Sequence, residues 1–183
     1  MARVAYIEAN STSADRQQLL QQIQGAFGAV PNMFKAVANS PAALTSMWAA
    51  FGALGQGVLP AKLAEQIAVA VAERNACEYC LAAHTALGRK AGASSEEMLA
   101  AQHGEAHDAK TSAALQFALK VVEQRAAISD ADVSTLRQHG FDDQQIVEIL
   151  AHVALNLFTN YVNVAFAVDL DFPAVKLLRD RGA

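Results

Sequence analysis

The chain has 183 residues, of which 53% are hydrophobic and 17% charged, with a net charge of −4. This length suits one domain over residues 1–183, and the alanine-rich composition with four prolines favours an all-α fold. No Lys/Arg cluster indicates a nucleic-acid partner, and no apolar run predicts a membrane span or signal peptide. We therefore expect a cytoplasmic protein, with some of its excess apolar surface buried between subunits.

Helix signals follow one another along the chain. Ser40-Pro41 pairs an N-cap serine with a proline at the first helical position, and Ser94-x-x-Glu97 is a capping box. Residues 1–12 and 103–110 are expected to be irregular, and no stretch predicts a strand. Apolar periodicity and capping residues predict helices over residues 15–27, 32–37, 41–54, 60–75, 77–92, 95–102, 111–126, 130–139 and 142–168.

A faint internal repeat relates the middle of the chain to its C-terminal part. The aligned pairs are Glu65 with Glu148, Cys77 with Asn160, Cys80 with Asn163, and His84 with Ala167. Identity between the two segments is low, so chance alignment is as good an explanation as descent. A true repeat predicts a degenerate duplicated helical hairpin that keeps its chemistry only in the first copy.

The most reactive stretch holds the only two cysteines, Cys77 and Cys80, with His84 four residues later and Glu65 twelve residues before the pair. In a reducing compartment, a Cys-x-x-Cys pair is more often redox-active or metal-binding than structural. At about 100° per residue, a helix that starts near Cys77 places both cysteines and His84 in one row. Glu65 must then reach this row from the preceding helix.

These residue types suit thiol redox chemistry. The thiolate is the reactive form of cysteine, and a helix N-terminus or a neighbouring imidazole favours it. His84 can supply that effect to Cys80, while Glu65 orients His84 or accepts a proton. Attack on a peroxide yields a sulfenic acid, which a second thiol converts to a disulfide, and an external dithiol then reduces it.

Other interpretations remain open from the residues alone. The four side chains also add up to a zinc ligand set, although the second separated ligand pair typical of structural zinc is missing. Two inert buried cysteines would leave a non-catalytic helical assembly protein. A decarboxylase-like or isomerase-like enzyme would use Glu65 and His84 without the thiols. His152, in the last long helix, is either a packed histidine or part of the pocket lining.

The spacing from Glu65 through Cys77-x-x-Cys80 to His84 resembles the core motif of the alkylhydroperoxidase D-like (AhpD-like) branch of the carboxymuconolactone decarboxylase superfamily. The close match covers residues 60–93, and a looser one extends through Gly140-Phe141 and residues 158–163, similar to peroxidase-related members. The resemblance implies an all-α AhpD-like domain that forms trimers or hexamers. It also implies a hydroperoxide substrate, an external dithiol reductant of lipoyl type, and neither cofactor nor metal.

The resemblance further implies roles for the motif residues. Cys80 attacks the peroxide, Cys77 resolves the sulfenic acid, and Glu65 and His84 relay protons. A helix-dipole argument alone would instead favour Cys77 as the attacking thiol. The sequence also departs from the best-known members, because Tyr79 stands where they carry a histidine before the second cysteine. A neutral phenol cannot transfer protons in the same way near pH 7, and we expect Tyr79 to line the pocket or pack at a subunit interface.

Overall fold

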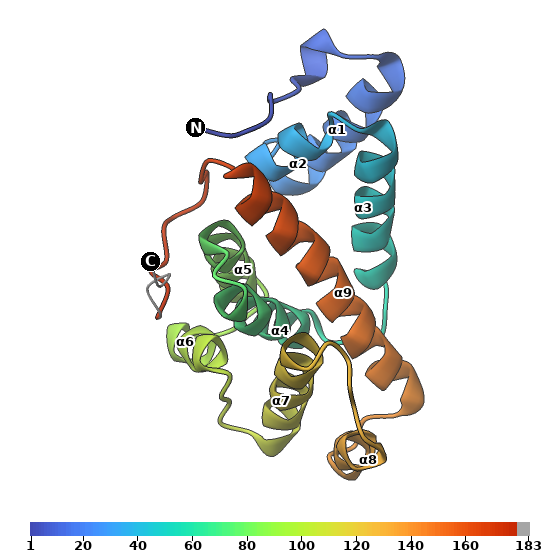
Figure 1. The fold of residues 1–183 in the computed structure, drawn as a ribbon, viewed down its shortest axis with the longest axis vertical. Coiled ribbons are helices and arrows are strands. Elements are labelled where there is room, and N and C mark those ends of the chain that lie inside the picture. Colours follow the sequence, from blue (N-terminus) through green and yellow to red (C-terminus); the bar gives the residue numbers. More distant parts are fainter. Residues whose placement is uncertain (179–183) are drawn as a thin grey trace.

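The protein was analysed as a computed structural model, which describes residues 1–178. The described part is helical and contains no strand, which confirms the all-α expectation (Figure 1). After a short 3₁₀ turn at Ala9–Ser11, the helices are α1 (Ala14–Phe27), α2 (Asn32–Val37), α3 (Pro41–Leu54), α4 (Ala61–Arg74), α5 (Glu78–Lys90), α6 (Ser95–His103), α7 (Ala109–Glu123), α8 (Asp130–Gln138) and α9 (Asp143–Phe166).

The helices begin where the sequence supplies capping groups. The Ser40 hydroxyl accepts a hydrogen bond from the Ala43 amide, and Ser94, Ser129 and Asp142 each form a reciprocal capping box. Each cap satisfies backbone donors that the first helical turn leaves without partners. The sequence therefore predicts most helix starts to within a residue.

The bounds of α7 differ from the predicted ones at both ends. This helix starts at Ala109 rather than residue 111, because the Asp108 carboxylate accepts from the Thr111 amide at 2.8 Å and caps the helix. It ends at Glu123 rather than residue 126, since Arg125 and Ala126 have φ values of 50° and 62°. This left-handed backbone terminates the helix, although neither residue is a glycine.

Helices α4 and α9 form the centre of the molecule. Helix α4 contacts α5, α6, α7 and α9, and its residues 66–72 are all buried. In Figure 1, α9 runs diagonally between α3 on one side and α4, α5 and α7 on the other. Among the described helices, only α9 is long and apolar enough to cross a membrane. It packs against α2, α3, α4, α5, α7 and α8, and 39% of its apolar stretch is buried.

After α9 the chain continues without helix through the rest of the described residues and lies against α2, α4 and α6. The Asn32 amide donates to Asp171 at 2.7 Å, the Leu178 amide donates to Glu73 at 3.1 Å, and Gln102 donates to the Lys176 carbonyl at 2.9 Å. These bonds hold the C-terminal segment beside α5, where it forms part of the wall of the site described next.

Candidate active site

Both cysteines lie at the N-terminus of α5. Ala76 has a left-handed φ of 50°, and Cys77 follows as the N-cap with extended backbone. The Cys80 amide donates a hydrogen bond to the Cys77 sulfur at 3.3 Å. Both residues are thiols and are buried, with 1% and 2% of their surfaces exposed. The turn thus brings the two side chains together at the N-terminus of α5, where backbone amides stabilise a negatively charged sulfur.

The structure places Glu65 of α4 against His84 of α5, as the spacing predicted. The His84 Nδ1 atom and a Glu65 carboxylate oxygen lie 2.7 Å apart, within hydrogen-bond distance. Gly88, one turn after His84, permits this close approach. A Cβ atom on Gly88 would lie 3.3 Å from the Glu65 Cβ and 2.5 Å from the Met98 methyl carbon. A small residue at this position lets the two helices pack closely enough for the pair to form.

The environment of Cys80 stabilises its thiolate. Burial by itself raises the pKa of this thiol, but the hydrogen bond with Cys77 and the charge of His84 lower it. The Asn163 and Asn160 amides add to the lowering, and Asn163 Nδ2 donates to the Cys80 sulfur at 3.1 Å. The net pKa is about 7. A substantial fraction of Cys80 is therefore ionised at neutral pH.

His84 is the matching cation. Burial lowers its pKa, but the charge of Glu65 and the hydrogen bond to it outweigh burial, so the pKa of His84 is raised above its ordinary value. A raised pKa keeps the imidazole protonated up to a higher pH than usual. The site therefore favours three charges held close together: a carboxylate on Glu65, an imidazolium on His84 and a thiolate on Cys80.

Asn160 and Asn163 are site residues that the sequence alone did not assign. Both are buried on α9, and Asn75 Nδ2 donates to the Asn160 side-chain oxygen at 2.9 Å. The internal repeat contained a usable signal, because it aligned Asn163 with Cys80, the residue whose sulfur it contacts.

Tyr79 is buried beside the cysteines rather than exposed. Its hydroxyl oxygen accepts a hydrogen bond from the Met33 amide at 3.3 Å, and its ring packs edge-on against Phe172 at 5.6 Å between centroids. Burial and the neighbouring Asp171 raise its pKa far above the ordinary value. Tyr79 therefore stays a neutral phenol, and its packing gives it a wall position between α2, α5 and the C-terminal segment.

Three cavities adjoin this cluster. An apolar one of about 40 Å³ is lined by Cys80, His84, Tyr79, Phe34, Phe51 and Phe172. A second, of about 360 Å³, is lined by Cys77, Tyr79, Asn163, Arg3, Val168 and Leu170. A third, of about 210 Å³, is lined by Glu65, His84, His152 and Asn156 together with apolar side chains. The Glu65–His84 pair thus lies between the first cavity and the third.

His152 lies on the Glu65 side of the pair. Its Nε2 atom is buried without a hydrogen-bond partner among the described residues, and burial lowers its pKa. An unsatisfied buried nitrogen is costly unless water reaches it, and the adjoining cavity has ample room for water. The structure therefore places His152 in a pocket beside the site, whereas the cavity that Cys80 lines does not include it.

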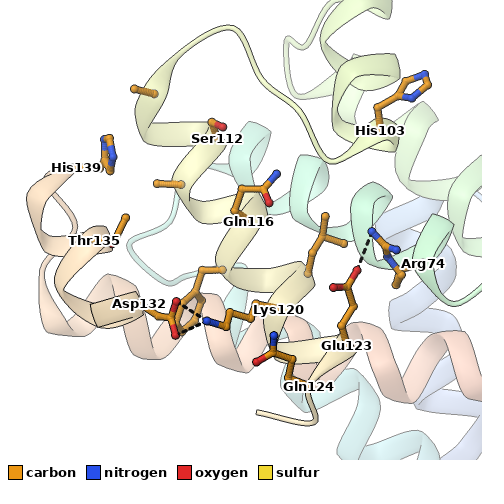
Figure 2. A pocket seen from close by; sticks show the side chains of 14 residues that line it. Arg74, His103, Ser112, Gln116, Lys120, Glu123, Gln124, Asp132, Thr135 and His139 are labelled. Atoms are coloured by element: carbon orange, nitrogen blue, oxygen red, sulfur yellow. Dashed lines mark hydrogen bonds and ion pairs between the residues drawn. The ribbon is translucent and has the colours of Figure 1, made fainter. Parts of the chain in front are cut away.

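A hollow larger than these three cavities lies elsewhere, along α7 and α8 (Figure 2). Its volume is about 660 Å³ and it contains neither cysteine. Its charged side chains include two ion pairs, Lys120 with Asp132 at 2.7 Å and Arg74 with Glu123 at 2.8 Å. These pairs neutralise much of the charge, and the redox-capable residues are all at the smaller cavities.

The four motif residues do not form a metal site. Within residues 1–178, no group of three or more His, Cys, Asp or Glu side chains is arranged to hold a metal ion. Glu65 instead engages His84 directly, and Asn163 occupies the side of Cys80 that faces α9. This arrangement favours thiol chemistry over the zinc alternative.

The fold and the site define a helical protein with a buried dithiol backed by a carboxylate–imidazole pair. Residues 41–124 match the carboxymuconolactone decarboxylase family, which together with the structural similarities below confirms the resemblance to AhpD-like members of that superfamily. No curated protein matches the chain in sequence.

Solved structures share this fold over nearly the whole chain. A peroxidase-related protein with an alkylhydroperoxidase AhpD core, from Ralstonia eutropha JMP134, is 28% identical with a TM-score of 0.86, over 93% of this chain and 92% of that one. A peroxidase-related protein from Silicibacter sp. TM1040 is 29% identical with a TM-score of 0.81, over 92% and 91%. The debrominase Bmp8, 17% identical with a TM-score of 0.79 over 92% and 91%, shares the fold alone. The fold thus supports more than one chemistry.

Proposed function

We propose that the protein is a thiol-dependent peroxidase that reduces hydroperoxides through Cys80 and Cys77. The observation that carries the proposal is the Cys80 sulfur itself. It has a pKa of about 7, it is joined to Cys77 through the α5 N-terminal turn, and with His84 it lines one apolar cavity. An activated thiolate, a second thiol and a proton donor are the three components that two-cysteine peroxide reduction requires.

The reaction balances with these residues. The Cys80 thiolate attacks the terminal oxygen of ROOH, the O–O bond breaks, and His84 gives a proton to the departing RO⁻, leaving ROH and a Cys80 sulfenic acid. The Cys77 thiol then attacks the Cys80 sulfur, which releases water and forms the Cys77–Cys80 disulfide. Glu65 holds His84 through the 2.7 Å contact and stabilises its protonated form. Water in the cavity lined by His152 is the route by which we expect the pair to regain its proton.

Loss of the two thiols after peroxide treatment measures formation of the disulfide directly. One equivalent of hydroperoxide per chain is expected to remove both titratable thiols, and mass spectrometry should show the loss of two hydrogens within one chain. Treatment with a dithiol should restore both thiols. Two thiols that persist after excess peroxide would contradict the proposal and would favour the non-catalytic alternative.

The cavity beside Cys80 indicates the substrate class. Most of the surface that lines this cavity is apolar, and its volume is about 40 Å³. Phe172 closes one side by packing on Tyr79. Such a cavity favours the small reactive end of a hydroperoxide and resists bulky substituents close to the O–O group.

Replacing Phe172 with alanine should widen this cavity. We expect the ratio of kcat/KM for cumene hydroperoxide to that for hydrogen peroxide to rise about tenfold, since apolar pocket walls discriminate by this order. Steady-state kinetics with both substrates measure the ratio. Phe166→Ala is the matched control, because Phe166 is a partly exposed phenylalanine at the end of α9 that does not line the cavity. An unchanged ratio in Phe172→Ala would show that Phe172 does not set substrate size.

We also propose that the protein is a homo-oligomer. Several large apolar side chains of α9 are exposed in the single chain, including Val147, Leu150 and Tyr161 at 65%, 43% and 60%. Apolar surface of this kind commonly marks a protein interface. Light scattering coupled to size-exclusion chromatography measures the number of subunits.

A further inference from the structure

The exposed face of α9 carries an apolar pattern that is the same in both directions along the helix. Ala154 lies at its centre, Leu150 and Phe158 lie four residues to either side, and Val147 and Tyr161 lie seven residues to either side. All five residues are exposed. At about 100° per residue, they fall within about 40° of one line along the helix. These five side chains therefore form a single stripe, which we call the α9 stripe.

The α9 stripe lies on the side of the helix that faces away from the core. Asn156 and Asn163, which lie about half a turn around the helix from Ala154, are both buried. Helix α9 is apolar enough to cross a membrane, yet only 39% of its apolar stretch is buried in the single chain. Much of the apolar surface that the chain leaves uncovered on α9 is thus gathered in the stripe.

We propose that the α9 stripe packs antiparallel on the α9 stripe of a second copy, across a two-fold axis that passes beside Ala154. In this arrangement Leu150 faces the partner's Phe158, and Val147 faces the partner's Tyr161. The inference rests on the homo-oligomer of the proposed function and makes its contact specific, and it does not depend on the peroxidase reaction.

The symmetry of the pattern selects a second copy as the partner. A two-fold contact is isologous, so a residue that touches a second position must itself be touched by that position in the other copy. The stripe meets this condition at each layer, because large side chains stand at equal distances on both sides of a small one. Ala154 lets the two helix axes approach closely at the centre, and the larger side chains fill the space to either side.

The charges on α9 are compatible with contact between two copies. The helix contains no Lys or Arg, and its two acidic residues are engaged within their own chain. Asp143 pairs with Arg137 at 2.8 Å, and the Glu148 carboxylate accepts from the Val58 amide at 2.7 Å. Two stripes therefore meet without unpaired like charges. A lipid surface is a poorer match, since helices that lie on membranes carry Lys and Arg beside their apolar face.

The size of the stripe suits the centre of a dimer contact. It spans about 21 Å of helix, and its four large side chains expose 38% to 65% of their surfaces. A standard interface buries about 800 Å² per partner, with an apolar centre inside a polar rim. Asp143 and Ala165, eleven residues to either side of Ala154, are exposed on the same line and extend the contact to its rim.

A cysteine at position 154 tests the two-fold axis. In a Cys77→Ser/Cys80→Ser background, Ala154→Cys places one thiol of each copy beside the axis, and we expect a short bismaleimide to crosslink most chains into dimers on a denaturing gel. Ala165→Cys is the matched control, because this alanine is exposed on the same face but its two copies would lie about 33 Å apart. Equal crosslinking at both positions, or none at position 154, would overturn the arrangement.

An exchange of charges tests the register with the native cysteines in place. Leu150→Lys and Phe158→Glu each put two unpaired charges into the contact, so each variant alone should raise the dimer Kd at least about a hundredfold. An equal mixture should form a heterodimer, because the new lysine faces the new glutamate and the remaining leucine faces the remaining phenylalanine. Native mass spectrometry identifies the heterodimer by its mass.

Val147→Lys mixed with Leu150→Glu is the matched control for this exchange. These two positions would lie about 16 Å apart across the contact, so the mixture should stay monomeric although it carries the same opposite charges. Rescue in the control mixture, or no rescue by Leu150→Lys with Phe158→Glu, would show that the register is wrong.

The outcomes separate this inference from the proposed function. If the wild-type chain is an oligomer that ignores the stripe variants, the α9 contact is wrong and the homo-oligomer stands. If the wild-type chain is a monomer at micromolar concentration, both fail, and the face belongs to a different partner. Peroxide consumption by the wild-type protein tests the peroxidase proposal independently of either result.

Discussion

Cys80→Ser is expected to lower peroxide consumption at least about a thousandfold, as removal of an enzyme's nucleophile does. The serine hydroxyl keeps the size of the thiol but stays protonated at neutral pH, so Asn163 and His84 have no sulfur anion to stabilise. The measurement is the initial rate of peroxide loss with a dithiol reductant in excess, compared with wild type at equal protein concentration.

Cys77→Ser should behave differently. This variant keeps the attacking sulfur, so it should reduce one equivalent of peroxide and stop as a Cys80 sulfenic acid, which dimedone traps and mass spectrometry detects. The reverse pattern, with a trapped sulfenic acid on Cys77 in Cys80→Ser, would assign the attack to Cys77 instead. Equal rates in wild type and both variants would contradict a thiol peroxidase altogether, and activity that survives replacement of both cysteines with alanine would favour a decarboxylase-like enzyme.

Glu65→Gln is expected to shift the pH dependence of Cys80 reactivity upward. In wild type, alkylation of Cys80 by iodoacetamide should rise with pH through about 7, because the thiol predominates below this pKa and the thiolate above it. Glutamine removes the charge that raises the pKa of His84, so His84 is less protonated and stabilises the thiolate less. We expect the alkylation midpoint to move up by about one pH unit, which corresponds to about 1.4 kcal/mol.

The peroxidase rate of Glu65→Gln should fall further than its alkylation rate, by about a hundredfold at pH 7, because His84 also serves as the proton donor. Peptide mapping of the alkylated protein over a pH series measures the midpoint for Cys80 alone. Glu78→Gln is the control: Glu78 is an exposed acid on the first turn of α5, and loss of its negative charge should leave the Cys80 midpoint unchanged or slightly lower. The same upward shift in both variants would show that Glu65 acts only through general charge.

Local sequence patterns were sufficient to predict the helices and one half of the candidate site. The caps at Ser40, Ser94 and Asp142 act over three residues, and the relation of Cys80 to His84 follows from a single helical turn. The contact of Glu65 with His84 was also predictable, because α4 and α5 are joined by a tight turn at residues 75–77 and must pack on each other.

The rest was decided by packing between segments far apart in the chain. Asn163 reaches Cys80 across 83 positions of sequence, and Phe172 closes the substrate cavity from a segment without helix. No periodicity encodes such contacts, because they depend on how α9 crosses α4 and α5. Tyr79 illustrates the same limit: the sequence marked it as a departure from the family motif, and only the fold made it the partition between two cavities.

The sequence by itself determined the helical class, the cysteine pair and the histidine that accompanies it, since all three depend on spacings within one or two turns. The tertiary structure alone decided that the Cys80 thiolate is stabilised by amides from α9 and that Cys77 faces a different cavity. Thiolate stability depends on burial and on the direction of nearby dipoles and charges, and these are set only when the helices have packed.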